Sequence, residues 1–167
     1  GPSTPALVMA VMLTRRPLRT LLVQKPPRLA IPFALLLAVC LHPLVLLLHG
    51  FPEFWYGWRH QLPALAAAGY RVWAPDLRGY NESEKPQGIA AYRLEVLAAD
   101  IIGLMDAAGQ EQACLVGHDW GGVITWWIAI HAPQRLQRMV VINAPHGAAM
   151  RQQLRRHPAQ WLRSAYV

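Results

Sequence analysis

The hexapeptide Gly117-His118-Asp119-Trp120-Gly121-Gly122 decides the fold of this chain. It follows a short apolar run, Ala113–Val116, and precedes a stretch predicted to be helical, Trp120–His131. A Gly-x-nucleophile-x-Gly sequence between a buried strand and a helix is typical of a nucleophile elbow, a sharp turn that exposes its central side chain. The residues two before and two after that side chain approach one another closely, so glycines are expected at both. The plainer alternative is a glycine-rich turn whose aspartate caps a helix.

The residue at the centre of this elbow is Asp119, where many hydrolases of this type have serine. A carboxylate that attacks an ester or amide would give an anhydride, which gains little. A carboxylate that attacks a saturated carbon bearing a good leaving group gives an alkyl-enzyme ester, which water can then cleave. Epoxides and alkyl halides have such carbons. The partial positive charge of the following helix N-terminus should keep the carboxylate ionised at neutral pH, and a serine-type esterase is excluded.

Outward from the elbow, apolar patterning predicts alternating strands and helices. Gly69 and Gly109 are expected to end two of the helices, and a long loop is expected over residues 75–91. The predicted elements in chain order are a strand at 44–48, a helix from about 55 to 68, a strand at 71–74, a helix at 94–108, a strand at 113–116, a helix at 120–131 and a strand at 139–142. This order predicts an α/β fold with a mostly parallel, doubly wound sheet and right-handed crossovers.

The segment His49-Gly50-Phe51-Pro52-Glu53 directly follows the first predicted strand. There, the backbone N–H of Phe51 can pair with the N–H of Trp120 to form a two-donor oxyanion hole for the intermediate of ester hydrolysis. One such donor lowers a reaction barrier by about 3–4 kcal/mol. The plainer interpretation is a β-turn after a strand. His49 is expected to organise this loop and not to carry protons.

Three further motifs extend the pattern at residues 76–86, 141–146 and 157–160. With the elbow and the His49–Glu53 segment, they closely resemble the epoxide hydrolases of the α/β-hydrolase superfamily, from about Leu44 to Tyr166. The resemblance implies that Asp119 opens an epoxide to an alkyl-enzyme ester, which is hydrolysed to a diol. It implies catalytic roles for Asp119, Phe51 and Trp120, and a substrate-binding surface made by Phe51, Pro52, Trp120 and His146.

The sequence departs from the family pattern at two of these motifs. Asn81 stands where a glycine is usual, a mild change because asparagine tolerates positive φ. Gly147 stands where proline is frequent. Two cap tyrosines, an acidic residue and a late histidine of the family have no counterpart, so we expect the α/β-hydrolase fold to be truncated before the cap and the C-terminal strands. The 167-residue chain by itself is then expected to be inactive.

The expected domain organisation has three parts. Residues 1–42 form an atypical leader, or a membrane anchor through the apolar residues 29–41, although this run is short for a spanning helix. Residues 43–156 form the N-terminal part of the hydrolase core, and residues 157–167 begin the cap. The expected localisation is therefore cytoplasmic, or membrane-anchored if the apolar residues 29–41 are a native membrane anchor.

The formal net charge of +7 is compatible with nucleic-acid binding. Five of the basic residues lie before residue 29, and no nucleic-acid motif accompanies them, so nucleic acid is not expected as a partner. A small-molecule epoxide is the expected partner, and no cofactor or metal is expected. The sequence does not indicate an oligomeric state. Haloalkane dehalogenase is the nearest alternative function, although Phe51 lacks a polar side chain to hold a halide. A non-catalytic truncated product is the alternative from another class.

Overall fold

The computed structural model describes residues 42–157 and 159. Contacts divide the chain into two units, Gly1–Pro43 and Leu44–Val167, and every element below belongs to the second. The predicted leader, including its apolar residues 29–41, lies outside the described residues except for its last position. Most of the predicted start of the cap at 157–167 also lies outside them. The division into a leader, a core and a cap therefore stays a prediction.

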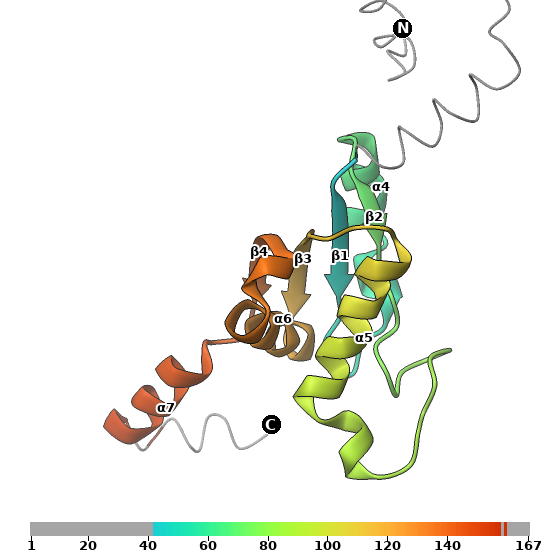
Figure 1. The fold of residues 1–167 in the computed structure, drawn as a ribbon. Coiled ribbons are helices and arrows are strands. Elements are labelled where there is room, and N and C mark those ends of the chain that lie inside the picture. The colour runs from blue at the N-terminus through green and yellow to red at the C-terminus, as the bar shows by residue number, and fades with distance from the viewer. Residues whose placement is uncertain (1–41, 158, 160–167) are drawn as a thin grey trace, which may run out of the picture. The chain divides into compact units, whose positions relative to one another are not determined.

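Four parallel strands form the sheet (Figure 1). Their spatial order is β2-β1-β3-β4, so the chain moves outward from β1 to β2 and then crosses to β3 and β4. Their bounds are Leu44–Leu48 for β1, Arg71–Trp73 for β2, Ala113–His118 for β3 and Leu136–Ile142 for β4. The prediction of an α/β fold with a parallel sheet is confirmed.

Helices cover both faces of this sheet because β1 is apolar on both sides. Its residues 44, 46 and 48 pack into a cluster with residues of α5 (Leu94–Ala107) and α6 (Trp120–His131). Val45 and Leu47 pack on the other face, against the 3-10 helix η1 (Trp55–Trp58) and α4 (Gln61–Ala67). Figure 1 shows α5 and α6 on the same side of the strands. Burial of alternate side chains on opposite faces is what a central parallel strand requires.

The single helix predicted from about residue 55 to 68 is wrong, because the segment is divided into η1 and α4. Pro63 explains the division. Proline has no N–H to donate, and its ring clashes with the carbonyl four residues earlier, here that of Arg59, so a continuous helix through both is unfavourable. The predicted end at Gly69 is confirmed by its φ of +89° and by the hydrogen bond from Tyr70 N to Leu65 O.

The remaining boundaries differ by a few residues. The 75–91 loop ends in a short 3-10 helix, η2 (Ile89–Tyr92). Two further helices flank β4 in the chain: η3 (Pro133–Arg135) precedes it and α7 (Gly147–Arg156) follows it. Strand β3 runs two residues beyond its predicted end, and β4 begins three residues before its predicted start. On β4, Val140 and Ile142 are 52% and 39% exposed, so this part of the sheet presents apolar side chains to the surface.

Candidate active site

The elbow places Asp119 between the end of β3 and the start of α6. Its backbone has φ 50° and ψ −116°, a conformation that a residue with a side chain rarely adopts. Two backbone hydrogen bonds hold the turn: Asp119 N donates to Ile142 O at 3.0 Å, and Asp119 O accepts from Val123 N at 3.0 Å. The first bond ties the turn to the end of β4. Backbone strain of this kind clusters at functional sites, and here it holds a half-buried carboxylate at the carboxyl edge of the sheet.

The glycines of the elbow are required by close backbone approach. A Cβ on Gly117 would lie 2.3 Å from Gly121 O, as the sequence pattern predicts. A Cβ on Gly121 would lie 2.3 Å from Leu48 O, so this second glycine makes room for strand β1. Gly122 lets α6 pack on the sheet, because its Cβ would lie 2.6 Å from Ala144 Cβ and 3.0 Å from Val141 Cγ1.

The loop after β1 reaches the Asp119 carboxylate. Phe51 N donates a hydrogen bond to Asp119 Oδ2 at 3.0 Å. Gly50 permits this approach, since a Cβ there would lie 2.5 Å from Asp119 Cβ. The loop is also a β-turn, closed by Glu53 N donating to Gly50 O at 3.0 Å, and the Phe51-Pro52 peptide is cis. The turn and the carboxylate contact are therefore two properties of one loop.

The two aromatic residues beside Asp119 are open to solvent. Phe51 is 65% exposed and Trp120 is 43% exposed, and Pro52 is exposed as well. Within residues 42–157 and 159, the backbone N–H of Trp120 has no hydrogen-bond acceptor, whereas the next N–H, of Gly121, donates to His49 O at 3.1 Å. Phe51 N–H is thus the backbone donor that contacts the carboxylate, and Trp120 N–H is a second donor, on the residue that follows Asp119.

His49 is fully buried behind this loop. Its Nδ1 lies 2.9 Å from Gly50 O, and its Nε2 lies 2.9 Å from Leu77 N. Its ring meets that of Tyr80 edge to face, with centroids 4.9 Å apart. His49 therefore joins the loop after β1 to the loop after β2, in agreement with the expectation that it organises the loop.

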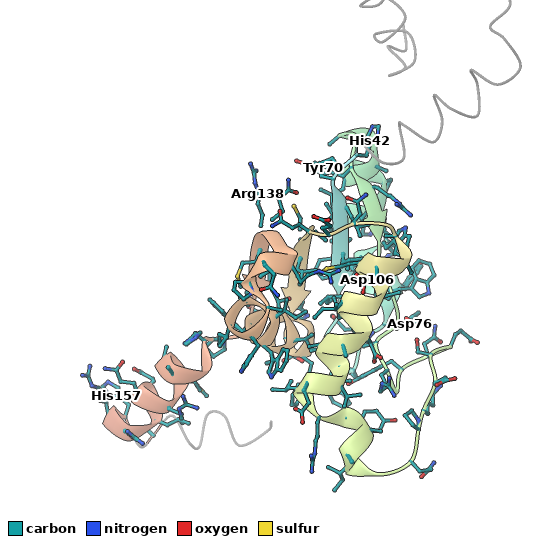
Figure 2. All side chains as sticks on the ribbon, viewed as in Figure 1. His42, Tyr70, Asp76, Asp106, Arg138 and His157 are labelled. Carbon is teal, nitrogen blue, oxygen red and sulfur yellow. The ribbon has the colours of Figure 1, made fainter. Side chains whose placement is uncertain are left out.

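Asp76 makes a second connection between these two loops (labelled in Figure 2). Its Oδ1 accepts from Trp55 N and its Oδ2 accepts from the Asn81 side-chain amide, both at 2.9 Å, while its carbonyl accepts from Ser83 Oγ at 2.6 Å. Asn81 has φ 41°. This left-handed conformation explains why an asparagine can stand at a position where glycine is usual, because asparagine tolerates positive φ and here gains a side-chain hydrogen bond.

Sequence reasoning missed a polar chain of three residues next to the elbow. His118 Nδ1 lies 3.0 Å from Glu53 Oε2, and His118 Nε2 lies 3.4 Å from the side-chain nitrogen of Asn143. Asn143 has φ 55° and follows β4. The chain links the loop after β1, the elbow and the loop after β4. The only sequence signal was that each of these polar residues lies within five residues of the end of a predicted strand.

Tyr80 was also missed. Burial raises the pKa of Tyr80 above its ordinary value of 10.0, and the negative charge of Asp119 raises it further. Its signal in the sequence was weak, since Tyr80 lies in a long loop whose residues are mostly polar, Gly or Pro.

His146, predicted to bind substrate, caps α7. Its Nδ1 accepts from Ala148 N at 3.3 Å, and its ring meets the Trp126 ring edge to face at 4.9 Å. Trp126 also donates from its indole nitrogen to Ala144 O at 2.9 Å. Among the described contacts of His146, none is with Asp119, Phe51 or Trp120, so its substrate role stays a prediction.

A second concave surface lies elsewhere in the described part of the chain. A cavity of about 610 Å³ opens between the loop after β2 and α5, and Arg78 crosses it to pair with Asp100 through two bonds of 2.6 and 2.7 Å. Asp119 does not line this cavity. The cavity is lined by the loop after β2 and by α5, away from the elbow, so the elbow is the candidate site.

A carboxylate on a strained strand-to-helix turn, with backbone donors beside it, defines a hydrolase of the nucleophile-elbow class. The sequence of residues 43–166 matches the family described as alpha/beta hydrolase fold. The chain therefore belongs to the alpha/beta hydrolase fold family.

Several relatives share about half of the matched residues. The chain is 51% identical over 125 residues to the AB hydrolase superfamily protein YfhM of Bacillus subtilis, which covers 75% of this chain and 44% of the relative. It is 50% identical to mouse epoxide hydrolase 4 over 74% of this chain and 34% of the relative. It is 54% identical to epoxide hydrolase B of Mycobacterium tuberculosis over 62% of this chain and 29% of the relative.

The chain is also similar to solved structures of epoxide hydrolases. An epoxide hydrolase from Vigna radiata matches with a TM-score of 0.61 and 46% identity, over 62% of this chain and 32% of that one. Epoxide hydrolase A from Mycobacterium thermoresistibile matches with a TM-score of 0.59 and 50% identity, over 59% and 31%. The chain spans less than half the length of each of these relatives, and over that span it is an epoxide hydrolase-like alpha/beta hydrolase.

Among the residues that the structure describes, no helix is both long enough and apolar enough to cross a bilayer.

Proposed function

We propose that the whole protein is an epoxide hydrolase in which Asp119 is the nucleophile. The observation that carries this proposal is the 3.0 Å hydrogen bond from Phe51 N to Asp119 Oδ2 on the strained elbow. Because Phe51 N–H holds Oδ2, the other carboxylate oxygen is the one left to attack. The attack forms a carbon–oxygen bond to one epoxide carbon and breaks the ring carbon–oxygen bond, and the released alkoxide takes a proton from an acid.

The same contact serves the second step. In the ester formed, Oδ2 is the carbonyl oxygen, and it becomes an oxyanion when water adds to the carboxyl carbon. Phe51 N–H and Trp120 N–H then stabilise that charge, by about 3–4 kcal/mol for one donor. Collapse of the intermediate releases the diol and returns Asp119 to a carboxylate. Phe51, Pro52 and Trp120 are proposed to line the substrate pocket, with His146 at its edge.

Other groups needed for turnover are proposed to lie elsewhere in the whole protein. These are the acid that protonates the alkoxide, and a histidine with an acidic partner that activates water. Among the described histidines, His118 has an acidic partner in Glu53, but its other ring nitrogen lies 3.4 Å from the side-chain nitrogen of Asn143. The rings of His49, His131 and His146 are engaged with backbone groups. We therefore propose that the 167-residue chain alone does not turn over.

Substrate assays on the whole protein distinguish the candidate functions. Purified wild-type protein and the Asp119→Asn variant are incubated with styrene oxide and, separately, with bromohexane, and diol and bromide are measured. We expect diol from styrene oxide only with the wild type, and no bromide. Bromide release without diol would establish a haloalkane dehalogenase, and folded wild-type protein that forms neither product would favour a non-catalytic role.

A further inference from the structure

The peptide group between Gly50 and Phe51 is held on both sides. Its N–H, on Phe51, donates to Asp119 Oδ2 at 3.0 Å. Its carbonyl, Gly50 O, lies 2.9 Å from His49 Nδ1 and accepts from Glu53 N at 3.0 Å. Because a peptide group is planar, the direction of the carbonyl fixes the direction of the N–H. Whatever holds Gly50 O therefore aims the donor at Asp119.

The hydrogen bonds of His49 determine where its ring proton lies. Leu77 N is a backbone donor, so His49 Nε2, 2.9 Å away, must accept from it. A neutral imidazole that accepts at Nε2 carries its proton on Nδ1, which then donates to Gly50 O. The side chain is completely buried, so water does not compete for either bond. His49 is thereby fixed in one tautomer and one orientation.

We propose that His49 is a positioning residue for the oxyanion donor of Phe51, an inference that rests on the function proposed above. The Nδ1–H of His49 fixes the Gly50 carbonyl, and by polarising that peptide it also strengthens the N–H on its other side. The hydrogen bond from Leu77 N to Nε2 makes the loop after β2 part of this arrangement, because it sets the tautomer. His49 acts through the peptide and does not touch the reacting atoms.

This role predicts an effect on one chemical step. During alkylation, Oδ2 loses negative charge as the carboxylate becomes an ester, so a well-aimed Phe51 N–H does not help this step. During ester hydrolysis, Oδ2 regains a full charge, and the same N–H stabilises it. Loss of the His49 bond should therefore slow hydrolysis and leave alkylation unchanged or slightly faster. A histidine that only fills the core would affect both steps together, through the folded fraction.

The test uses rapid quenching and intact-mass measurement on the whole protein with styrene oxide. In His49→Leu, we expect ester hydrolysis to fall about 10- to 100-fold, alkylation to be kept, and alkyl-enzyme to accumulate. His49→Gln, which offers both a donor and an acceptor, should recover most of the hydrolysis rate. His131→Leu, a change at the far end of α6, is the matched control and should leave both steps unchanged.

Three outcomes would overturn the proposal. These are equal loss in both steps for His49→Leu, unchanged hydrolysis in that variant, or no recovery in a folded His49→Gln variant. If neither variant folds, nitrogen NMR of the wild-type imidazole decides, since a proton found on Nε2 would also overturn it. Failure of the proposed function is recognised separately, because the wild type would then form no alkyl-enzyme.

Discussion

Alanine at Gly117 tests whether close backbone approach builds the elbow. The added Cβ would lie 2.3 Å from Gly121 O, 2.5 Å from Gly121 C and 2.6 Å from Gly122 N. All three are backbone atoms of the elbow and the first turn of α6, so no flexible side chain can move aside. Overpacking costs about 1–3 kcal/mol when the surroundings relax. Because this backbone is held between two strands, we expect a loss of about 3 kcal/mol or more.

Gly103→Ala in α5 is the matched control. A Cβ there meets nothing within 4 Å, and the residue is exposed in the interior of a helix. Alanine is a better helix former than glycine, so we expect a gain of about 0.5–1 kcal/mol. Urea unfolding of both variants and the wild type gives the free energies of unfolding. A Gly117→Ala variant as stable as the wild type would refute the reasoning, whatever the control shows.

Four further predictions concern residues of the elbow and of the loops after β1 and β2. Asn81→Val should cost about 1–2 kcal/mol of unfolding free energy because a branched residue is strained at φ 41°, whereas Asn81→Gly should be near neutral; urea unfolding measures both. In Asp119→Asn, the pKa of Tyr80 should fall towards 10.0 in a tyrosinate absorbance titration, because one cause of its rise is removed. Since the folded pKa of Tyr80 is raised, its contribution to stability is complete below pH 10.0 and is lost as the pH rises beyond that value, which urea unfolding at alkaline pH can follow. Gly50→Ala should lower diol formation roughly 100-fold, because its Cβ would lie 2.5 Å from Asp119 Cβ and displace the reacting group; unchanged turnover in that variant would contradict the geometry.

The sequence predicted best where one short segment carries both the pattern and its physical cause. Strand β1 was predicted with its observed bounds because all five of its residues are apolar and both faces are buried. Helix α6 was likewise predicted with its observed bounds, since the elbow fixes its start. The place of Asp119, and the approach of Phe51 N to its carboxylate, followed from two local motifs on neighbouring strands.

Prediction failed where a contact joins residues that are distant in sequence, and where polar residues in a strand give no apolar pattern. The start of β4 was missed because Gln137 and Arg138 are exposed on an edge strand and give no apolar signal. The contact between His118 and Glu53 joins residues 65 positions apart, and only the sheet order brings them together. The single helix predicted over 55–68 failed for a local reason that could have been read, namely Pro63 in its middle.

The most direct test of the central claim is to find the covalent intermediate on Asp119. Whole protein is mixed with styrene oxide, quenched in acid before turnover is complete, digested, and mapped by mass spectrometry. We predict that the peptide containing Asp119 carries the mass of one epoxide on that carboxylate, and that the adduct is absent from Asp119→Asn. Diol formation with no adduct on Asp119, or an adduct on another residue that persists in Asp119→Asn, would contradict the account.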